Sequence, residues 1–137
     1  MDSKSQSNSN AANILIVDDS LDMRIYTKTI LKQYNIIEAE NGQIALEIIK
    51  NNSIDLLITD YLMPKMDGIE LLKEIRKENY VFPIIVITST NFEQKKIEMF
   101  RLGIDNYVIK PFFKEELLNI VNRALVYHKT LIKEKSK

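Results

Sequence analysis

An α/β fold, the doubly wound three-layer sandwich with one five-stranded parallel sheet, is predicted by three features of the sequence. Short apolar runs alternate with helix-like segments five times along the chain. The runs are apolar at consecutive positions, which is typical of parallel strands that helices cover on both faces. The chain has 137 residues and shows no internal repeat, so we expect one domain with a substantial core.

The apolar runs are the predicted strands. They cover Asn13–Val17, Asn35–Ala39, Leu56–Thr59, Ile84–Ile87 and Asn106–Ile109. Each run is short and is followed by a segment with a different hydrophobic period. Strands that alternate with helices in this way favour βαβ units and therefore a parallel sheet.

The segments between the strands have apolar residues three and four positions apart, as on one face of a helix. They predict helices over Leu21–Gln33, from Asn41-Gly42 through Ile49, over Gly68–Lys77, over Glu93–Leu102 and from Lys114 to about Leu131. Gly103 is suited to end the fourth helix. Asn41-Gly42 and Asp67-Gly68 indicate tight turns at which helices begin, so we leave both outside the functional site.

The composition excludes several classes of function. Nineteen Lys and Arg balance nineteen Asp and Glu, so no basic field favours direct binding of nucleic acid. The chain has no cysteine for disulfides or thiolate metal sites, and its single histidine, His128, does not support a His-rich zinc site. With three glycines and no Gly-rich phosphate loop, a P-loop NTPase is also excluded.

The two ends of the chain are polar. Residues 1–12 are mostly Ser, Asn, Gln and charged residues, and we expect a disordered leader without the apolar core of a signal peptide. We expect the folded domain over residues 13–131, followed by a charged tail over residues 132–137. The longest apolar run is too short to span a bilayer, so we expect a cytoplasmic protein with no membrane partner.

Charged residues follow three of the predicted strands at their carboxyl ends. Asp18-Asp19 follows the first strand, Asp60 the third and Lys110 the fifth, while Thr88 adds a hydroxyl after the fourth. The carboxyl ends of parallel strands meet at one edge of the sheet, where such folds bind ligands. Three carboxylates, one Mg²⁺ and one lysine sum to zero charge. This balance suits a divalent metal and a phosphoryl group.

Each of these residues also has an ordinary structural explanation. Either Asp18 or Asp19 could cap the first helix, since aspartate is a common capping residue. Asp60 could simply open a loop, and Lys110 could be a solvated strand end. Ser20 is available for the cap, however, which leaves the two carboxylates without that explanation. Two carboxylates about 4 Å apart repel by roughly 4 kcal/mol at an effective dielectric constant of 20, and a bound Mg²⁺ would remove this cost.

Four segments of the chain resemble the receiver domain of two-component response regulators. They are Ile14–Ser20, Asp60–Gly68, Ile84–Ser89 and Tyr107–Phe112. Each motif alone is moderately specific, but all four in this order and spacing are highly specific. The resemblance covers about residues 13 to 127. It implies a flavodoxin-like sheet with the strand order 2-1-3-4-5.

The resemblance implies chemical roles for the residues at the strand ends. Asp60 would be the phosphoacceptor, with Thr88 and Lys110 in contact with the phosphoryl group. Thr88 and Tyr107 would form a switch in which the tyrosine changes rotamer when the threonine moves. The peptide bond between Lys110 and Pro111 would be cis.

The resemblance also implies a metal site and a tuning position. Mg²⁺, or Mn²⁺ in its place, would be held by Asp18, Asp19, Asp60 and the backbone carbonyl of Leu62. In this family the residues at the positions of Leu62 and Thr90 tune dephosphorylation. Leu62 offers no polar group to orient a hydrolytic water, so we expect a long-lived phosphorylated state.

The function implied is that of a phosphorylation-controlled switch. A histidine kinase or histidine phosphotransfer protein would supply the phosphoryl group. The fourth helix, fifth strand and fifth helix would then bind a downstream protein or an output domain removed from this chain, and Phe92, Met99 and Phe100 make this region rich in large apolar groups. Phosphoryl transfer would be self-catalysed and autodephosphorylation slow. A phosphatase of the haloacid dehalogenase type would need a second acid where Leu62 stands, so we expect no separate substrate turnover.

The last helix leaves two interpretations open. Apolar residues and one histidine lie three and four apart, as in a heptad seam, at Leu118, Val121, Leu125, His128 and Ile132. A weak homodimer or a coiled-coil linker could use this seam, and a dimer could also form through the fourth helix, fifth strand and fifth helix. An amphipathic terminal helix produces nearly the same pattern, and we favour it.

Overall fold

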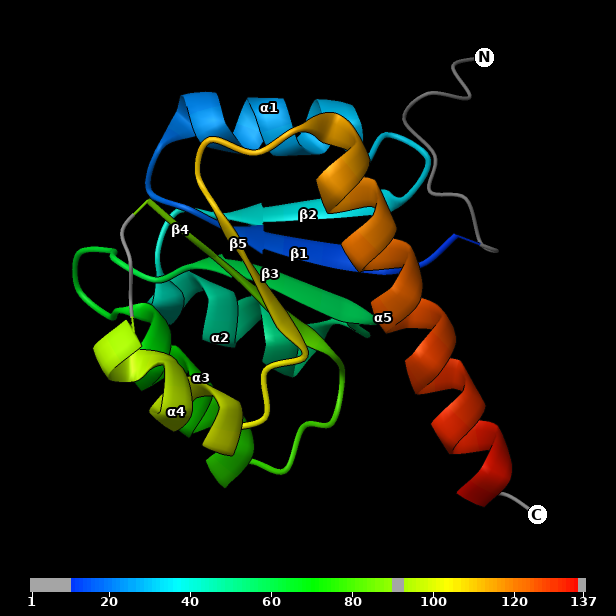
Figure 1. The fold of residues 1–137 in the computed structure, drawn as a ribbon. Helices are drawn as coiled ribbons and strands as arrows, with labels where there is room; N and C mark the ends of the chain where they lie inside the picture. Colours follow the sequence, from blue (N-terminus) through cyan, green and yellow to red (C-terminus); the bar gives the residue numbers. More distant parts are fainter. Residues whose placement is uncertain (1–10, 90–92, 136–137) are drawn as a thin grey trace.

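A computed structural model of the chain describes residues 11–89 and 93–135. Within these residues, five strands alternate with five helices (Figure 1). The strands are β1 (Asn13–Val17), β2 (Asn35–Ala39), β3 (Leu56–Asp60), β4 (Ile84–Thr88) and β5 (Asn106–Ile109). The helices are α1 (Leu21–Ile30), α2 (Gly42–Asn51), α3 (Gly68–Lys77), α4 (Glu93–Arg101) and α5 (Lys114–Lys135).

The strands form one parallel sheet in the order β2-β1-β3-β4-β5, which confirms the predicted order. The order reverses between β1 and β3, whose carboxyl ends therefore lie side by side at the switch point of the sheet. Val17 of β1 pairs there with Thr59 of β3. Asp18 and Asp60, which follow Val17 and Thr59, therefore lie at the ends of adjacent strands.

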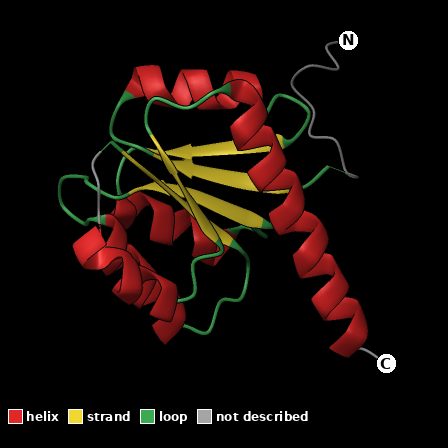
Figure 2. Ribbon diagram, in the orientation of Figure 1, coloured by secondary structure: helices red, strands yellow, loops and turns green. Residues whose placement is uncertain are grey.

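Two layers of helices cover the sheet. Helices α1 and α5 lie on one face, and α2, α3 and α4 lie on the other (Figure 2). Successive strand residues face opposite layers, so Ile14 and Ile16 pack toward α1 and α5 while Leu15 and Val17 pack on the other side. This division of β1 between two cores explains why its apolar run is continuous.

Three of the helices are capped at their amino ends by side chains. Ser20 accepts a hydrogen bond from the backbone of Met23, so it caps α1 in place of the neighbouring aspartates. Asn41 caps α2 and Asp67 caps α3, where Glu70 completes a capping box. The structural roles predicted for Asn41-Gly42 and Asp67-Gly68 are confirmed.

Some predicted boundaries differ from the structure. Helix α1 ends at Ile30 rather than Gln33, because the backbone of Tyr34 donates to the carbonyl of Leu31 and closes a turn that the helix cannot continue through. Strands β3 and β4 each include one more residue at the carboxyl end, and α4 ends one residue earlier than predicted.

The ends of the chain also differ from expectation where the structure describes them. Ala11 and Ala12 were assigned to the leader, yet both carbonyls accept hydrogen bonds from Asn35. Helix α5 continues past Leu131 to Lys135, through residues predicted as a tail, and extends beyond the sheet (Figure 1). None of the helices within residues 11–89 and 93–135 combines the length and the apolar character that a membrane span requires.

Candidate functional site

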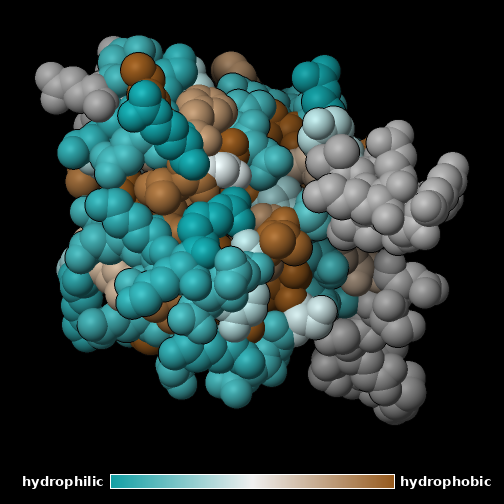
Figure 3. Space-filling model, turned by 90° about the horizontal axis from the view of Figure 1, so that it is seen from below, coloured by the Kyte–Doolittle hydropathy of each residue, from teal (hydrophilic) through white to brown (hydrophobic). Residues whose placement is uncertain are grey.

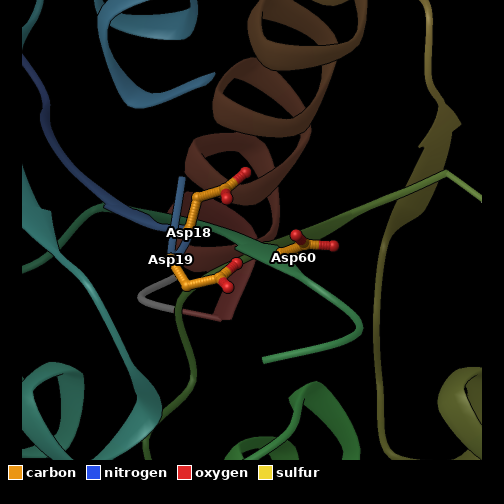
Figure 4. A group of neighbouring side chains, drawn as sticks. All are labelled: Asp18, Asp19 and Asp60. Carbon is orange, nitrogen blue, oxygen red and sulfur yellow. The ribbon is translucent and has the colours of Figure 1, made fainter. Parts of the chain in front are cut away.

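Three carboxylates gather at the carboxyl edge of the sheet. Asp18 and Asp19 follow β1, and Asp60 ends β3, so the adjacent strands place their side chains together (Figure 4). One carboxylate oxygen from each lies within 4.8 Å of the others. Asp18 and Asp60 are buried and Asp19 is exposed, which leaves the cluster open to solvent on one side.

Lys110 follows the edge strand β5, and its side chain reaches this cluster. Its ammonium nitrogen lies 3.3 Å from Asp18 Oδ2 and 3.3 Å from Asp60 Oδ2. The residue follows β5, and its backbone nitrogen donates to the carbonyl of Thr88 at 2.7 Å. The peptide bond to Pro111 is cis, as predicted. Lys110 therefore bridges the two buried carboxylates.

Burial and charge act together on Asp60. Burial raises the pKa of its carboxyl above the usual value, and the charge of Asp18 raises this pKa further. Lys110 and a backbone hydrogen bond from Tyr61 lower the pKa without cancelling the rise. Three carboxylates beside one lysine leave an excess of negative charge in the cluster, which favours a bound cation.

The donor set fits Mg²⁺. The cluster offers three carboxylates and has no nitrogen or sulfur ligand, and hard divalent cations prefer oxygen. Asp18 is already oriented, because its Oδ1 accepts a hydrogen bond from the Ser20 backbone at 2.9 Å while Oδ2 faces Lys110.

The other predicted residues lie around the cluster. Thr88 is buried at the carboxyl end of β4, next to Ile109 of β5. Leu62 follows Asp60 by two positions and is 55% exposed. Thr90, the second tuning position, lies outside the described residues.

Tyr107 contacts helix α4 from its place in β5. Its half-buried ring meets the Phe100 ring edge-on with centroids 6.2 Å apart, and the Lys96 ammonium lies 5.2 Å from the ring centroid. Phe100 is exposed, as is Ile97 on the same helix, whereas Met99 belongs to the core. Phe92 lies outside the described residues.

On the face that carries α2, α3 and α4, the helices expose the large apolar residues Ile44, Ile97 and Phe100. Seen from below, this side of the molecule is mainly hydrophilic, with hydrophobic groups gathered in patches between the polar ones (Figure 3). A separate hollow of about 830 Å³ lies at the amino edge of the sheet, away from the carboxylates. Its lining includes Tyr34, Tyr80, Phe82 and His128.

Two further residues lie against the backbone of the cluster, and the sequence did not predict this position for either of them. Gly68 begins α3, and a Cβ atom at this position would lie 2.9 Å from the backbone oxygen of Asp60. Arg24 donates from Nη1 to the backbone oxygen of Asp18 at 2.6 Å. The Asp-Gly pair marked the first only as a turn, and nothing in the sequence distinguished Arg24 from the other charged residues of its helix.

The comparisons with known proteins agree with the fold. The family model described as the response regulator receiver domain matches residues 14–122. The probable transcriptional regulator ycf27 of Cyanidium caldarium is 41% identical over 116 residues, which cover 83% of this chain and 46% of that protein. The chemotaxis protein CheY of Bacillus subtilis is 37% identical over 118 residues, covering 84% of this chain and 98% of that protein.

A solved structure gives the same result. The response regulator receiver domain protein (CheY-like) from Methanospirillum hungatei superposes with a TM-score of 0.84 at 28% identity, over 88% of this chain and 98% of that one. The chain spans less than half of the length of the first curated relatives it matches. It spans nearly all of the chemotaxis proteins.

Proposed function

The chain belongs to the response regulator receiver family, and on this premise we propose that it is a switch controlled by phosphorylation of Asp60. One observation carries the proposal. The Asp60 carboxylate lies beside two further carboxylates and the Lys110 ammonium, at the edge where parallel sheets bind ligands. A carboxylate in this setting can act as a nucleophile toward a phosphoryl group.

The proposed reaction moves a phosphoryl group from a phosphohistidine to Asp60. An Asp60 oxygen forms a bond to phosphorus while the bond between phosphorus and the histidine nitrogen breaks, and the nitrogen keeps the electron pair. Lys110 favours the ionised form of Asp60 and neutralises charge on the phosphoryl oxygens. The Thr88 hydroxyl, at the end of the next strand, donates a hydrogen bond to one of these oxygens.

The proposed metal ligands are Asp18, Asp19, Asp60 and the backbone carbonyl of Leu62, for Mg²⁺ or for Mn²⁺ in its place. When bound, the ion supplies positive charge to the oxygens of the group being transferred. The Ser20 backbone N–H donates to Asp18 Oδ1 and so orients this ligand by a hydrogen bond that does not involve Asp60.

Receiver domains are signalling domains, and they act with histidine kinases and output domains. For this chain we propose a cytoplasmic location, with a histidine kinase or histidine phosphotransfer protein as donor. The signal would pass from Thr88 through Tyr107 to the surface of α4, β5 and α5, where Ile97 and Phe100 offer apolar contacts. Leu62 stands where a hydrolase of the dehalogenase type needs an acid, which favours a switch over an enzyme with turnover.

Incubation with acetyl phosphate tests the proposal directly. We expect a mass increase of one phosphoryl group that requires Mg²⁺ and is lost in Asp60→Asn. Asp105→Asn is the matched control, because it makes the same chemical change at the opposite edge of the sheet and should be labelled like the wild type. Labelling of Asp60→Asn, or labelling without any divalent metal, would contradict the assignment.

A further inference from the structure

The guanidinium of Arg24 lies against the backbone of the acidic turn. Arg24 is on α1, and its side chain is only 14% exposed. Its Nη1 donates to the backbone oxygen of Asp18 at 2.6 Å, and its Nε donates to Glu38 Oε1 at 3.1 Å. A single side chain thus connects the turn after β1 to strand β2.

The bonded oxygen belongs to the peptide unit between Asp18 and Asp19. A peptide unit is planar, so fixing its oxygen also restricts the direction in which the Asp19 side chain leaves the backbone. The backbone N–H of Asp18 itself donates to the carbonyl of Ala39 at 3.1 Å. The turn is therefore fixed to β2 twice, by the backbone and by Arg24.

Glu38 holds the guanidinium in place. It lies on β2 opposite Ile16, and besides Arg24 it accepts a hydrogen bond from Lys28 Nζ at 3.3 Å. Arginine suits this position because its rigid fork presents donors to two acceptors in different directions. Lysine, with one flexible ammonium, does not reproduce this geometry.

We propose that Arg24 is a positioning residue for the metal site, and that it sets the affinity for Mg²⁺ through the Asp18 carbonyl. This inference rests on the proposed function. Residues that orient metal ligands from behind typically change metal affinity by about 10- to 100-fold when they are replaced. The charge of Arg24 has the opposite effect, because a guanidinium near a cation site repels the cation. Positioning and charge therefore predict opposite results when the charge is removed.

The test measures Mg²⁺ affinity of the whole chain without a phosphodonor, by titration of backbone amide NMR signals. For Arg24→Lys and Arg24→Gln we expect affinity about tenfold weaker than that of the wild type. Lys28→Gln is the matched control, because it removes the other partner of Glu38 and leaves the turn untouched. We expect its affinity to stay within about twofold of the wild type.

Three outcomes distinguish the alternatives. Unchanged or tighter binding in Arg24→Gln overturns the inference, because charge then outweighs position. Failure of the wild type to bind Mg²⁺ overturns the proposed metal site as well. If the Arg24 variants do not fold, Glu38→Gln takes their place, since loss of the Glu38 charge weakens its bond to Arg24 Nε and so loosens the hold of the guanidinium on the Asp18 carbonyl. We expect it to weaken binding about threefold, and unchanged binding in that variant also overturns the inference.

Discussion

The two edges of the sheet use aspartate in opposite ways. At the amino edge, Asp55 and Asp105 each precede a strand, and each bonds twice to the first residue of the neighbouring strand. Asp55 pairs in this way with Asn13, and Asp105 with Ile84. At the carboxyl edge, Asp60 instead faces another carboxylate and a lysine.

The difference shows what makes an aspartate available to a ligand. The amino-edge carboxylates satisfy N–H groups that would otherwise lie unpaired where a strand begins. At the carboxyl edge the nearby helix starts are capped by Ser20 and Asp67, so that duty does not fall on Asp19 or Asp60. Whether an aspartate stabilises a strand start or is available to a ligand therefore depends on the edge of the sheet at which it lies.

Gly68→Ala should have the largest effect and tests how closely the carboxyl edge is built. An added Cβ would meet the backbone oxygen of Asp60 at 2.9 Å, and backbone cannot give way easily. We expect a loss of about 3 kcal/mol in the free energy of unfolding, measured in urea, together with weaker phosphorylation. Gly42→Ala is the control, because the three atoms nearest to its Cβ all belong to the Met66 side chain, which can shift more easily than backbone, and it should cost about 1 kcal/mol. Equal losses would show that the close backbone contact is unimportant.

Asp105→Asn should lower stability, since it weakens the bond to the Ile84 backbone, which is 2.8 Å long. A charged acceptor forms a stronger hydrogen bond than a neutral amide, so we expect a loss of about 1.5 kcal/mol by urea denaturation. The same measurement on Asp60→Asn provides the comparison. Two losses of similar size would remove the distinction between the edges.

Asp60→Asn should raise stability by about 1 kcal/mol near neutral pH without metal. Because folding raises the pKa of Asp60, this group favours the folded state at low pH, and the benefit is lost as pH rises through its folded pKa. The higher stability of the variant should therefore vanish at a pH well below the pKa of a free aspartate. Denaturation of both proteins across this range checks the sign, and a variant less stable than the wild type at neutral pH would refute it.

Leu62→Asn should have the smallest effect and concerns the lifetime of the proposed phosphorylated state. An amide beside Asp60 can orient a water for hydrolysis, which the exposed leucine does not. We expect the phosphorylated protein to decay about threefold faster, or about 0.7 kcal/mol in activation free energy, by loss of the added mass over time. Leu62→Met should decay like the wild type. An unchanged rate in the asparagine variant would sink the hypothesis.

The fold was largely predictable because its strongest signals are local. The continuous apolar run of β1 predicted burial on both faces, and Asp67-Gly68 predicted the start of α3. The end of α1 was not predictable, because it depends on a turn closed by Tyr34. The length of α5 was underestimated because its last residues are charged, although Lys and Glu are good helix formers.

The site was predictable where residues follow strands and hidden where contacts depend on packing. Asp18, Asp60 and Lys110 could be placed together, because strand ends in a parallel sheet share an edge. The bond from Arg24 to Asp18 joins a helix side chain to a backbone oxygen, and no local pattern signals it. Gly68 showed its turn in the sequence but not its closeness to Asp60.

The ion pairs of Lys110 join segments that are 92 and 50 residues apart in the chain. A fragment that lacks β1, β3 or β5 lacks part of the site. The site therefore forms only when these strands have assembled into the sheet. Anything bound there is linked to the folding equilibrium of the whole sheet rather than to one loop. Hydrogen exchange of amides in these three strands should therefore slow together when a ligand binds. Binding at one small site would then raise the free energy of opening of the whole domain.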